Sequence, residues 1–207
     1  GLLSDQRAVY ATAVDLLAEQ AAAASGAAAE EAALAALALA EQAKARELLD
    51  ALAGGGSGAP LAPAELAALA PRLGPTIAFF FGERRLWRWY SDGGRWEVSA
   101  AGTPGEIAAL VTRIHRRLAR AEPADGDDFA RLGALLLPRS LAASAELRIV
   151  PDGRLFYLPF ELLPDPQRPG GTLVERLAIS YLPGLSIFPH LRSPAAATRW
   201  RLAALAD

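Results

Sequence analysis

A glycine- and serine-rich run at residues 54–58 divides this 207-residue sequence into two parts with different periodicities. Long patterns rich in alanine and leucine precede the run, and short β-prone segments come after it. Gly/Ser-rich segments form flexible linkers, so we expect a domain boundary with a linker over residues 54–62. A phosphate-binding loop would follow a strand and lead into Gly-Lys-Ser/Thr, which this run does not. The sequence therefore predicts an α/β protein that begins with a separate helical unit.

The first 53 residues predict a helical hairpin of the kind found in helical-repeat proteins. Ser4 and Asp5 are suitable N-cap residues, and Ser25–Gly26 separates the first helix from a second one over residues 27–52. The first helix carries an apolar stripe at Val9, Tyr10, Ala13, Leu16 and Leu17. One such hairpin cannot bury its own apolar stripe, so it needs further repeats or must dock onto the rest of the chain.

Residues 63–145 predict a small α+β region with an antiparallel meander. Its strands are expected over residues 76–81, 86–90 and 95–100, because hairpin turn residues separate them. Tryptophans alternate with arginines here, which is also a pattern of nucleic-acid platforms. Because the net charge is −2, we interpret the sheet as half-buried, with a charged outer face, and expect no nucleic-acid partner.

Two helices come after the meander. Thr103, Pro104 and Glu106 form a strong helix start for residues 103–120, and a second helix is expected over residues 127–137. The first of these helices has a basic face around His115, formed by Arg113, Arg116, Arg117 and Arg120. Such a face is usually only solvated, and the alternative is a docking surface for an acidic partner.

Residues 146–207 predict a buried sheet with tight turns. Strands are expected over residues 146–150, 177–182 and 201–207, and the 177–182 run is apolar enough to be covered on both faces. Pro151–Gly153 forms a turn, and Pro183–Gly184 opens a short helix that reaches about Leu191.

The inventory of reactive residues is small. The chain has no cysteine and only two histidines, His115 and His190, so we expect no disulfide, no metal and no cofactor. Ser186 and His190 lie four residues apart, but Gly184-Leu-Ser186 lacks the second glycine of a nucleophile elbow. Asp152, Glu161 and Asp165 are too ordinary a set of loop carboxylates to indicate acid–base chemistry. The residues alone therefore predict no catalytic site.

Residues 147–163 carry a resemblance to a known family. Leu147-Arg-Ile-Val-Pro-Asp-Gly-Arg-Leu-Phe-Tyr-Leu-Pro-Phe-Glu-Leu-Leu163 resembles the opening strand and turn of the CHAT domain, a caspase-like domain associated with tetratricopeptide repeats. Residues 173–186 are similar to the next segment of that family, and residues 40–50 to the last helix of the preceding repeats. The resemblance extends from about residue 9 to the end of the sequence.

The resemblance implies a caspase-type α/β/α sandwich and cysteine-dependent peptide cleavage by a His–Cys dyad. Neither histidine lies in the His-Gly context of that family, and a thiolate nucleophile needs a cysteine. No catalytic residue is therefore transferred to this chain. The positions that match are expected to be structural or to line one wall of a substrate cleft: Asp152, Gly153, Tyr157, Pro159, Phe160 and Glu161.

These observations predict the non-catalytic front part of a caspase-like cysteine peptidase, with the catalytic half beyond this chain. The alternative is an interaction module, or a degenerate peptidase without a catalytic role. The expected partners are the catalytic half and a protein or peptide bound by the helical hairpin. The alanine- and arginine-rich composition suggests a high-GC bacterial genome, and without a signal segment or an apolar span we expect a cytoplasmic protein without membrane contact.

Overall fold

The computed structural model describes residues 2–52, 60–122, 126–139, 141 and 143–191. The α-helices are α1 (Leu2–Ala23), α2 (Gly26–Leu52), α3 (Pro63–Leu73), α4 (Pro104–Ala119) and α5 (Gly126–Leu136). The strands are β1 (Pro75–Phe81), β2 (Leu86–Asp92), β3 (Glu97–Ala100), β4 (Glu146–Val150) and β5 (Ala178–Tyr181). Short 3₁₀ turns are η1 (Gly153–Tyr157), η2 (Phe160–Leu162), η3 (Leu173–Glu175) and η4 (Leu185–His190).

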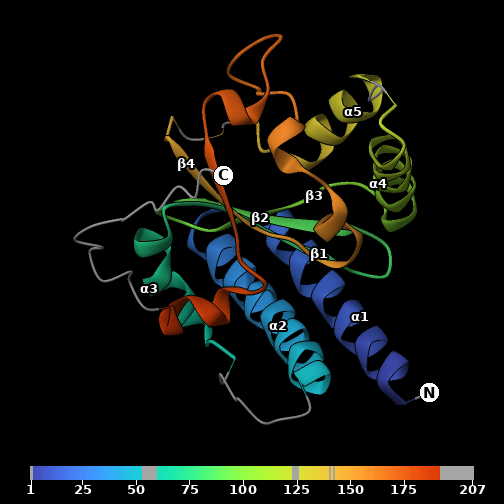
Figure 1. Ribbon diagram of the computed structural model, residues 1–207. Coiled ribbons are helices and arrows are strands. Elements are labelled where there is room, and N and C mark those ends of the chain that lie inside the picture. The colour runs from blue at the N-terminus through green and yellow to red at the C-terminus, as the bar shows by residue number, and fades with distance from the viewer. Residues whose placement is uncertain (1, 53–59, 123–125, 140, 142, 192–207) are drawn as a thin grey trace, which may run out of the picture.

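The five strands form one mixed sheet in the order β3-β2-β1-β4-β5 (Figure 1). Strands β1, β2 and β3 make the predicted antiparallel meander, whereas β1, β4 and β5 run parallel. Pairing of β1 with β4 joins the meander to the later strands, so the sheet crosses the expected boundary at residue 145/146. Helices cover both faces, which confirms the expected α/β class with an N-terminal helical hairpin.

The hairpin of α1 and α2 docks onto one face of the sheet, together with α3 (Figure 1). Three tryptophans of the meander are buried beneath these helices, and each indole N–H donates to a helix. Trp87 donates to the Asp15 carboxylate at 2.6 Å, Trp89 to the Ala33 carbonyl at 2.9 Å, and Trp96 to the Leu66 carbonyl at 3.2 Å. Docking on the sheet buries a different face of α1 from the predicted stripe: Ala11, Val14 and Ala18 are buried, whereas Val9 and Leu16 are 69% and 53% exposed.

Helices α4 and α5 cover the opposite face, together with η1, η2 and η3. This corrects the expectation of a charged outer face on the meander. The Arg88 side chain points under α5, where it donates to the Leu137 carbonyl at 2.6 Å and to the Ser99 hydroxyl at 2.8 Å. Strand β2 is therefore buried on both faces, and the carbonyl groups at the end of α5 and the Ser99 hydroxyl accept from the two Nη groups of Arg88.

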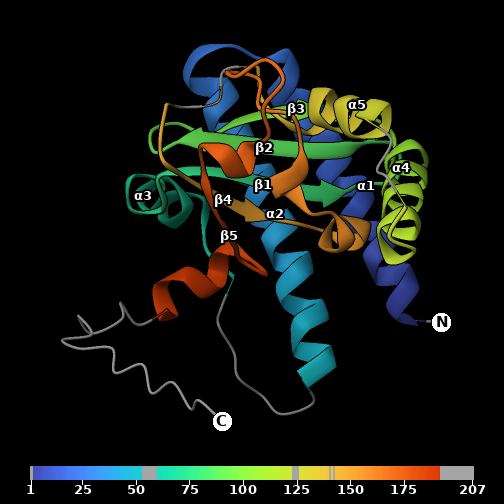
Figure 2. The same cartoon turned by 45° about the horizontal axis from the view of Figure 1, so that its top comes forward.

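Strand β5 corrects a second expectation. It lies at the edge of the sheet formed by the described residues, beside β4 (Figure 2). Three of its four residues are exposed and only Ile179 is half-buried, so the run is not covered on both faces. Burial on both faces needs a neighbouring strand and two covering layers, and β5 has one neighbour here.

Most element boundaries agree with the sequence. Thr103 caps α4 by accepting from the Glu106 amide, as predicted. The predicted N-cap at Ser4 and Asp5 is wrong, because α1 already begins at Leu2 and both residues lie inside it. The predicted strand over residues 201–207 and most of the 54–62 linker lie outside the described residues.

Candidate functional site

The candidate site lies where the three parallel strands end. Strands β1, β4 and β5 finish at Phe81, Val150 and Tyr181, on the same edge of the sheet. Ligands of open α/β sheets bind outside this carboxyl edge, in the loops that leave the strands. The loops that leave β4 and β5 here are held by side chains from both helical layers.

Asp152 is the first anchor of this edge. Its buried carboxylate accepts the Phe81 amide at the end of β1 at 2.6 Å, and Arg7 of α1 approaches it at 3.4 Å. Strand β4 stops at Val150, opposite Ala78, so the Asp152 side chain supplies an acceptor for the end of β1. Gly153 is next, with φ of +49°, and a Cβ there would lie 3.0 Å from the Phe81 ring. Only glycine fits this turn without strain.

Two charged residues of α2, Glu41 and Lys44, bind the segments that follow β5 and β4. The Lys44 ammonium donates to the Pro151 carbonyl at 3.3 Å, directly after β4. The Glu41 carboxylate accepts the Ser186 amide at 3.1 Å, shortly after β5, and its other oxygen lies 3.9 Å from Lys44. Both side chains are buried, and removing one partner of such a pair leaves an uncompensated charge. One helix of the hairpin therefore binds the loops after both β4 and β5.

Phe160, Glu161 and Tyr181 form a cluster on the other side of the same edge. Phe160 is fully buried against Phe79, with ring centres 5.6 Å apart. The Tyr181 hydroxyl accepts the Phe160 amide at 3.3 Å and donates to the Glu161 carboxylate at 2.8 Å. Burial, reinforced by Glu161, raises the pKa of Tyr181 well above its ordinary value. The tyrosine therefore stays protonated as a structural donor.

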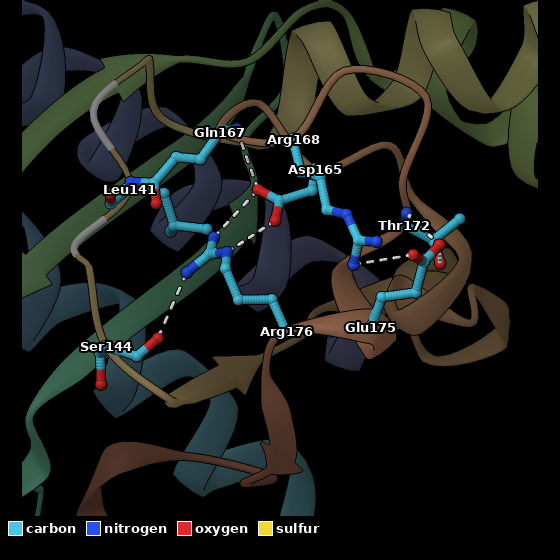
Figure 3. Close-up of polar contacts among 8 residues, drawn as sticks. All are labelled: Leu141, Ser144, Asp165, Gln167, Arg168, Thr172, Glu175 and Arg176. Atoms are coloured by element: carbon cyan, nitrogen blue, oxygen red, sulfur yellow. Dashed lines mark hydrogen bonds and ion pairs between the residues drawn. The ribbon is translucent and has the colours of Figure 1, made fainter.

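The segment between η2 and η3 is closed by an ion pair (Figure 3). Arg176 donates to both oxygens of Asp165, at 2.6 and 2.9 Å, and also to the Ser144 carbonyl at 3.2 Å. The hydrogen bond from Arg176 holds the pKa of Asp165 below its usual value. Arg168 and Glu175 form a second, more exposed ion pair at 3.0 Å. The loop is thus folded back onto itself before β5.

Tyr157 lies apart from the other matched residues. It is 60% exposed, and its ring meets His115 of α4 edge to face at 5.6 Å. Val111, Thr112, His115, Arg154 and Tyr157 line an open pocket of about 150 Å³ between α4 and η1. Pro159 is half-buried between the two turns.

The six predicted residues thus occupy three places: the end of β1, the Phe160 core and the α4 pocket. The structure gives Asp152, Gly153 and Phe160 structural contacts. Whether Tyr157, Pro159 and Glu161 line a substrate cleft stays a prediction.

The serine considered as a nucleophile has a different environment. The Ser186 hydroxyl is buried 3.4 Å from Glu41, while the side chain of His190 lies outside the described residues. Within the described ranges, no three His, Cys, Asp or Glu residues gather as metal ligands would. None of the helices in those ranges has the length and apolarity needed to cross a bilayer. The arrangement holds loops in place, and we find no complete catalytic group among these residues.

The fold and this edge define an α/β/α protein in which a helical hairpin is fastened to the ends of parallel strands. Residues 128–207 match the family model of the CHAT domain, which confirms the resemblance seen in the Val150-Pro-Asp-Gly153 region. The match begins in α5 and includes β4 and β5, so it suggests a caspase-like peptidase family for this part. The resemblance of the hairpin and meander lies outside the matched residues. No curated protein and no solved structure matches the chain.

Sequence patterns alone provided little warning of the anchors on the hairpin. Arg7, Asp15, Glu41 and Lys44 each contact a loop at a strand end, yet none was a candidate. A signal existed, because Lys44 is the only lysine of the chain, and Glu41 and Lys44 lie four and seven residues after Leu37, on the same helix face. Charged residues on the buried stripe of a helix need partners, so such positions indicate a contact even when its identity is hidden.

Proposed function

We propose that this chain is the supporting, non-catalytic part of a CHAT-type cysteine peptidase. The match over residues 128–207 supports a caspase-like family, whose chemistry needs a thiolate. The 207 residues contain no cysteine. The nucleophile of such an enzyme would therefore have to come from polypeptide outside these residues, packed beside the exposed edge of β5.

The observation that carries this proposal is the pair of contacts made by α2. Lys44 binds the loop after β4 and Glu41 binds the loop after β5, and both loops lie at the edge where α/β proteins bind ligands. A partner that shifts the helical hairpin would shift both loops with it. The hairpin would then regulate a catalytic centre that forms at this edge, which is the role we assign to it.

The first test is an assay of the purified 207-residue chain on a peptide library, with and without a thiol-alkylating agent. We expect no turnover in either condition. Cysteine-type turnover by the chain itself would contradict the proposal.

The alternative is that the chain is an interaction module or a degenerate peptidase, and the lack of cysteine is consistent with this alternative as well. The second test separates the two. The coding sequence after Asp207 should contain a His-Gly pair, then a strand and a cysteine. A stop codon, or other residues in place of the His-Gly pair or the cysteine, would favour the alternative.

In an active longer polypeptide, Glu41→Gln should lower kcat more than it changes KM. Arg95→Gln, on an exposed side chain paired with Glu30, should change neither.

A further inference from the structure

The pocket between α4 and η1 has the features of a binding site for an anionic group. Its lining combines the polar or charged residues Arg154, His115, Tyr157 and Thr112 with the apolar Val111. Arg154 is exposed and forms no ion pair with the residues of the described ranges. A cation beside a concave surface and without a carboxylate partner can bind an anion from outside.

Among the described residues that line the pocket, none is acidic and Arg154 is positively charged, although the chain as a whole is slightly acidic. Arg116 is an exposed neighbour of His115 on α4. Arg113 of the same helix is directed elsewhere, because it binds Asp128 of α5 at 2.7 Å. The four arginines of the predicted basic face are not among the residues that line the pocket, so Arg154 of η1 supplies its positive charge. A local cationic patch attracts acidic partners even when the net charge does not.

The surroundings of the pocket are aromatic. Phe156 and Tyr157, neighbours in η1, are 56% and 60% exposed. Large apolar side chains that stay exposed next to each other commonly mark contact surfaces. Cations combined with aromatic rings suit a peptide that carries both carboxylate and apolar side chains. A pocket of about 150 Å³ has room for one carboxylate side chain, and not for a nucleotide.

We propose that this pocket binds an acidic peptide segment, with a carboxylate on Arg154 and His115 and an apolar side chain against Phe156 and Tyr157. The site lies on η1, which begins immediately after the Asp152 anchor. Peptide binding there would act on the loop that leaves β4. This inference does not depend on the chain being part of a peptidase.

The test is fluorescence anisotropy with a fluorescein-labelled peptide of four glutamates flanking one phenylalanine. The matched probe has glutamine in place of each glutamate. We expect the acidic probe to bind at low salt and the glutamine probe to bind at least about tenfold more weakly, since one charge-assisted hydrogen bond contributes about 1.5–3 kcal/mol.

The variants should separate the pocket from general surface charge. Arg154→Gln should weaken the acidic probe about tenfold, and His115→Gln by a smaller factor. Arg95→Gln removes an exposed arginine that pairs with Glu30 beside β3 and should leave binding unchanged within about twofold. Arg154 and Arg95 are both exposed, so the two substitutions should leave the fold intact, as circular dichroism would verify.

Several outcomes would overturn the proposal. If Arg154→Gln and Arg95→Gln lowered the affinity for the acidic probe equally, the attraction would be non-specific. If the glutamine probe bound as tightly as the acidic probe, a carboxylate would not be needed for binding. Displacement of the probe by millimolar inorganic phosphate would make this a phosphate site. Tighter, Arg154-dependent binding of a single-stranded oligonucleotide or of anionic lipid vesicles would point to a different class of partner.

Discussion

The two faces of the sheet are covered by helices in different ways. On the hairpin face, buried polar groups of the helices reach the sheet and its loops: Asp15 binds the β1–β2 turn and Trp87, and Glu41 and Lys44 bind the loops after β5 and β4. On the other face the contacts with the sheet are mainly apolar, and ion pairs such as Arg113–Asp128 lie at the helix surface.

This difference bears on how each layer can influence the strand ends. Apolar burial is non-directional, whereas buried hydrogen bonds fix direction and distance. Movement of the hairpin would therefore be passed directly to the loops after β4 and β5, which Lys44 and Glu41 hold by buried hydrogen bonds. Single substitutions on each face can test this contrast.

The largest effect is expected on the apolar face. Phe160→Ala should lower the free energy of unfolding by about 4 kcal/mol, because Phe160 is fully buried against Phe79 and its removal leaves a cavity. Phe160→Leu should cost much less, since it keeps most of the volume. Denaturant unfolding measures both. If both variants lost the same free energy of unfolding, the shape of the Phe160 ring, and not its volume, would determine the stability of this face.

A matched pair of aspartates compares the two faces directly. Asp15→Ala should cost about 3 kcal/mol, because it leaves the Trp87 indole and the Glu83 and Arg84 amides without an acceptor. Asp128→Ala removes a surface ion pair with Arg113 and weaker charge interactions with Arg117 and Arg131, and should cost only about 1 kcal/mol. If the two variants unfold at the same denaturant concentration, the contrast between the faces is wrong.

A smaller effect, of about 2 kcal/mol at neutral pH, is expected for Asp165→Asn, since Arg176 would lose a buried carboxylate partner. The pKa of Asp165 is lowered in the folded protein, so its stabilisation is fully present above the unfolded value of about 3.9. That stabilisation is lost as the pH falls below this value, toward the folded pKa. Wild-type and variant stabilities should therefore converge in acid, and a constant difference from pH 7 to pH 2 would contradict the assignment.

The sequence predicted the local elements better than their burial. The hairpin connection between β2 and β3, the turn at Pro151–Gly153 and the Thr103 cap depend on neighbouring residues, and all three were recognisable. The cover over Arg88 and the exposure of β5 were predicted wrongly, because burial depends on segments far away in the chain.

The same reason explains why the contacts at the strand ends were missed. Asp152 and Gly153 were found through the family resemblance. The partners of Asp152, Arg7 and Phe81, are 145 and 71 residues away in sequence, and Ser186 is 145 residues from Glu41. No local pattern records such pairings, which form only when the hairpin docks on the sheet and β4 pairs with β1.

The most direct test of the link between hairpin and strand ends is amide hydrogen exchange in Glu41→Gln. This variant keeps the side-chain shape but removes the charged acceptor of the Ser186 amide. We predict about tenfold faster exchange in residues 183–188, with β3 unchanged, because about 1.4 kcal/mol of local stability would be lost. Unchanged exchange at residues 183–188, or an equal increase in β3, would contradict the account.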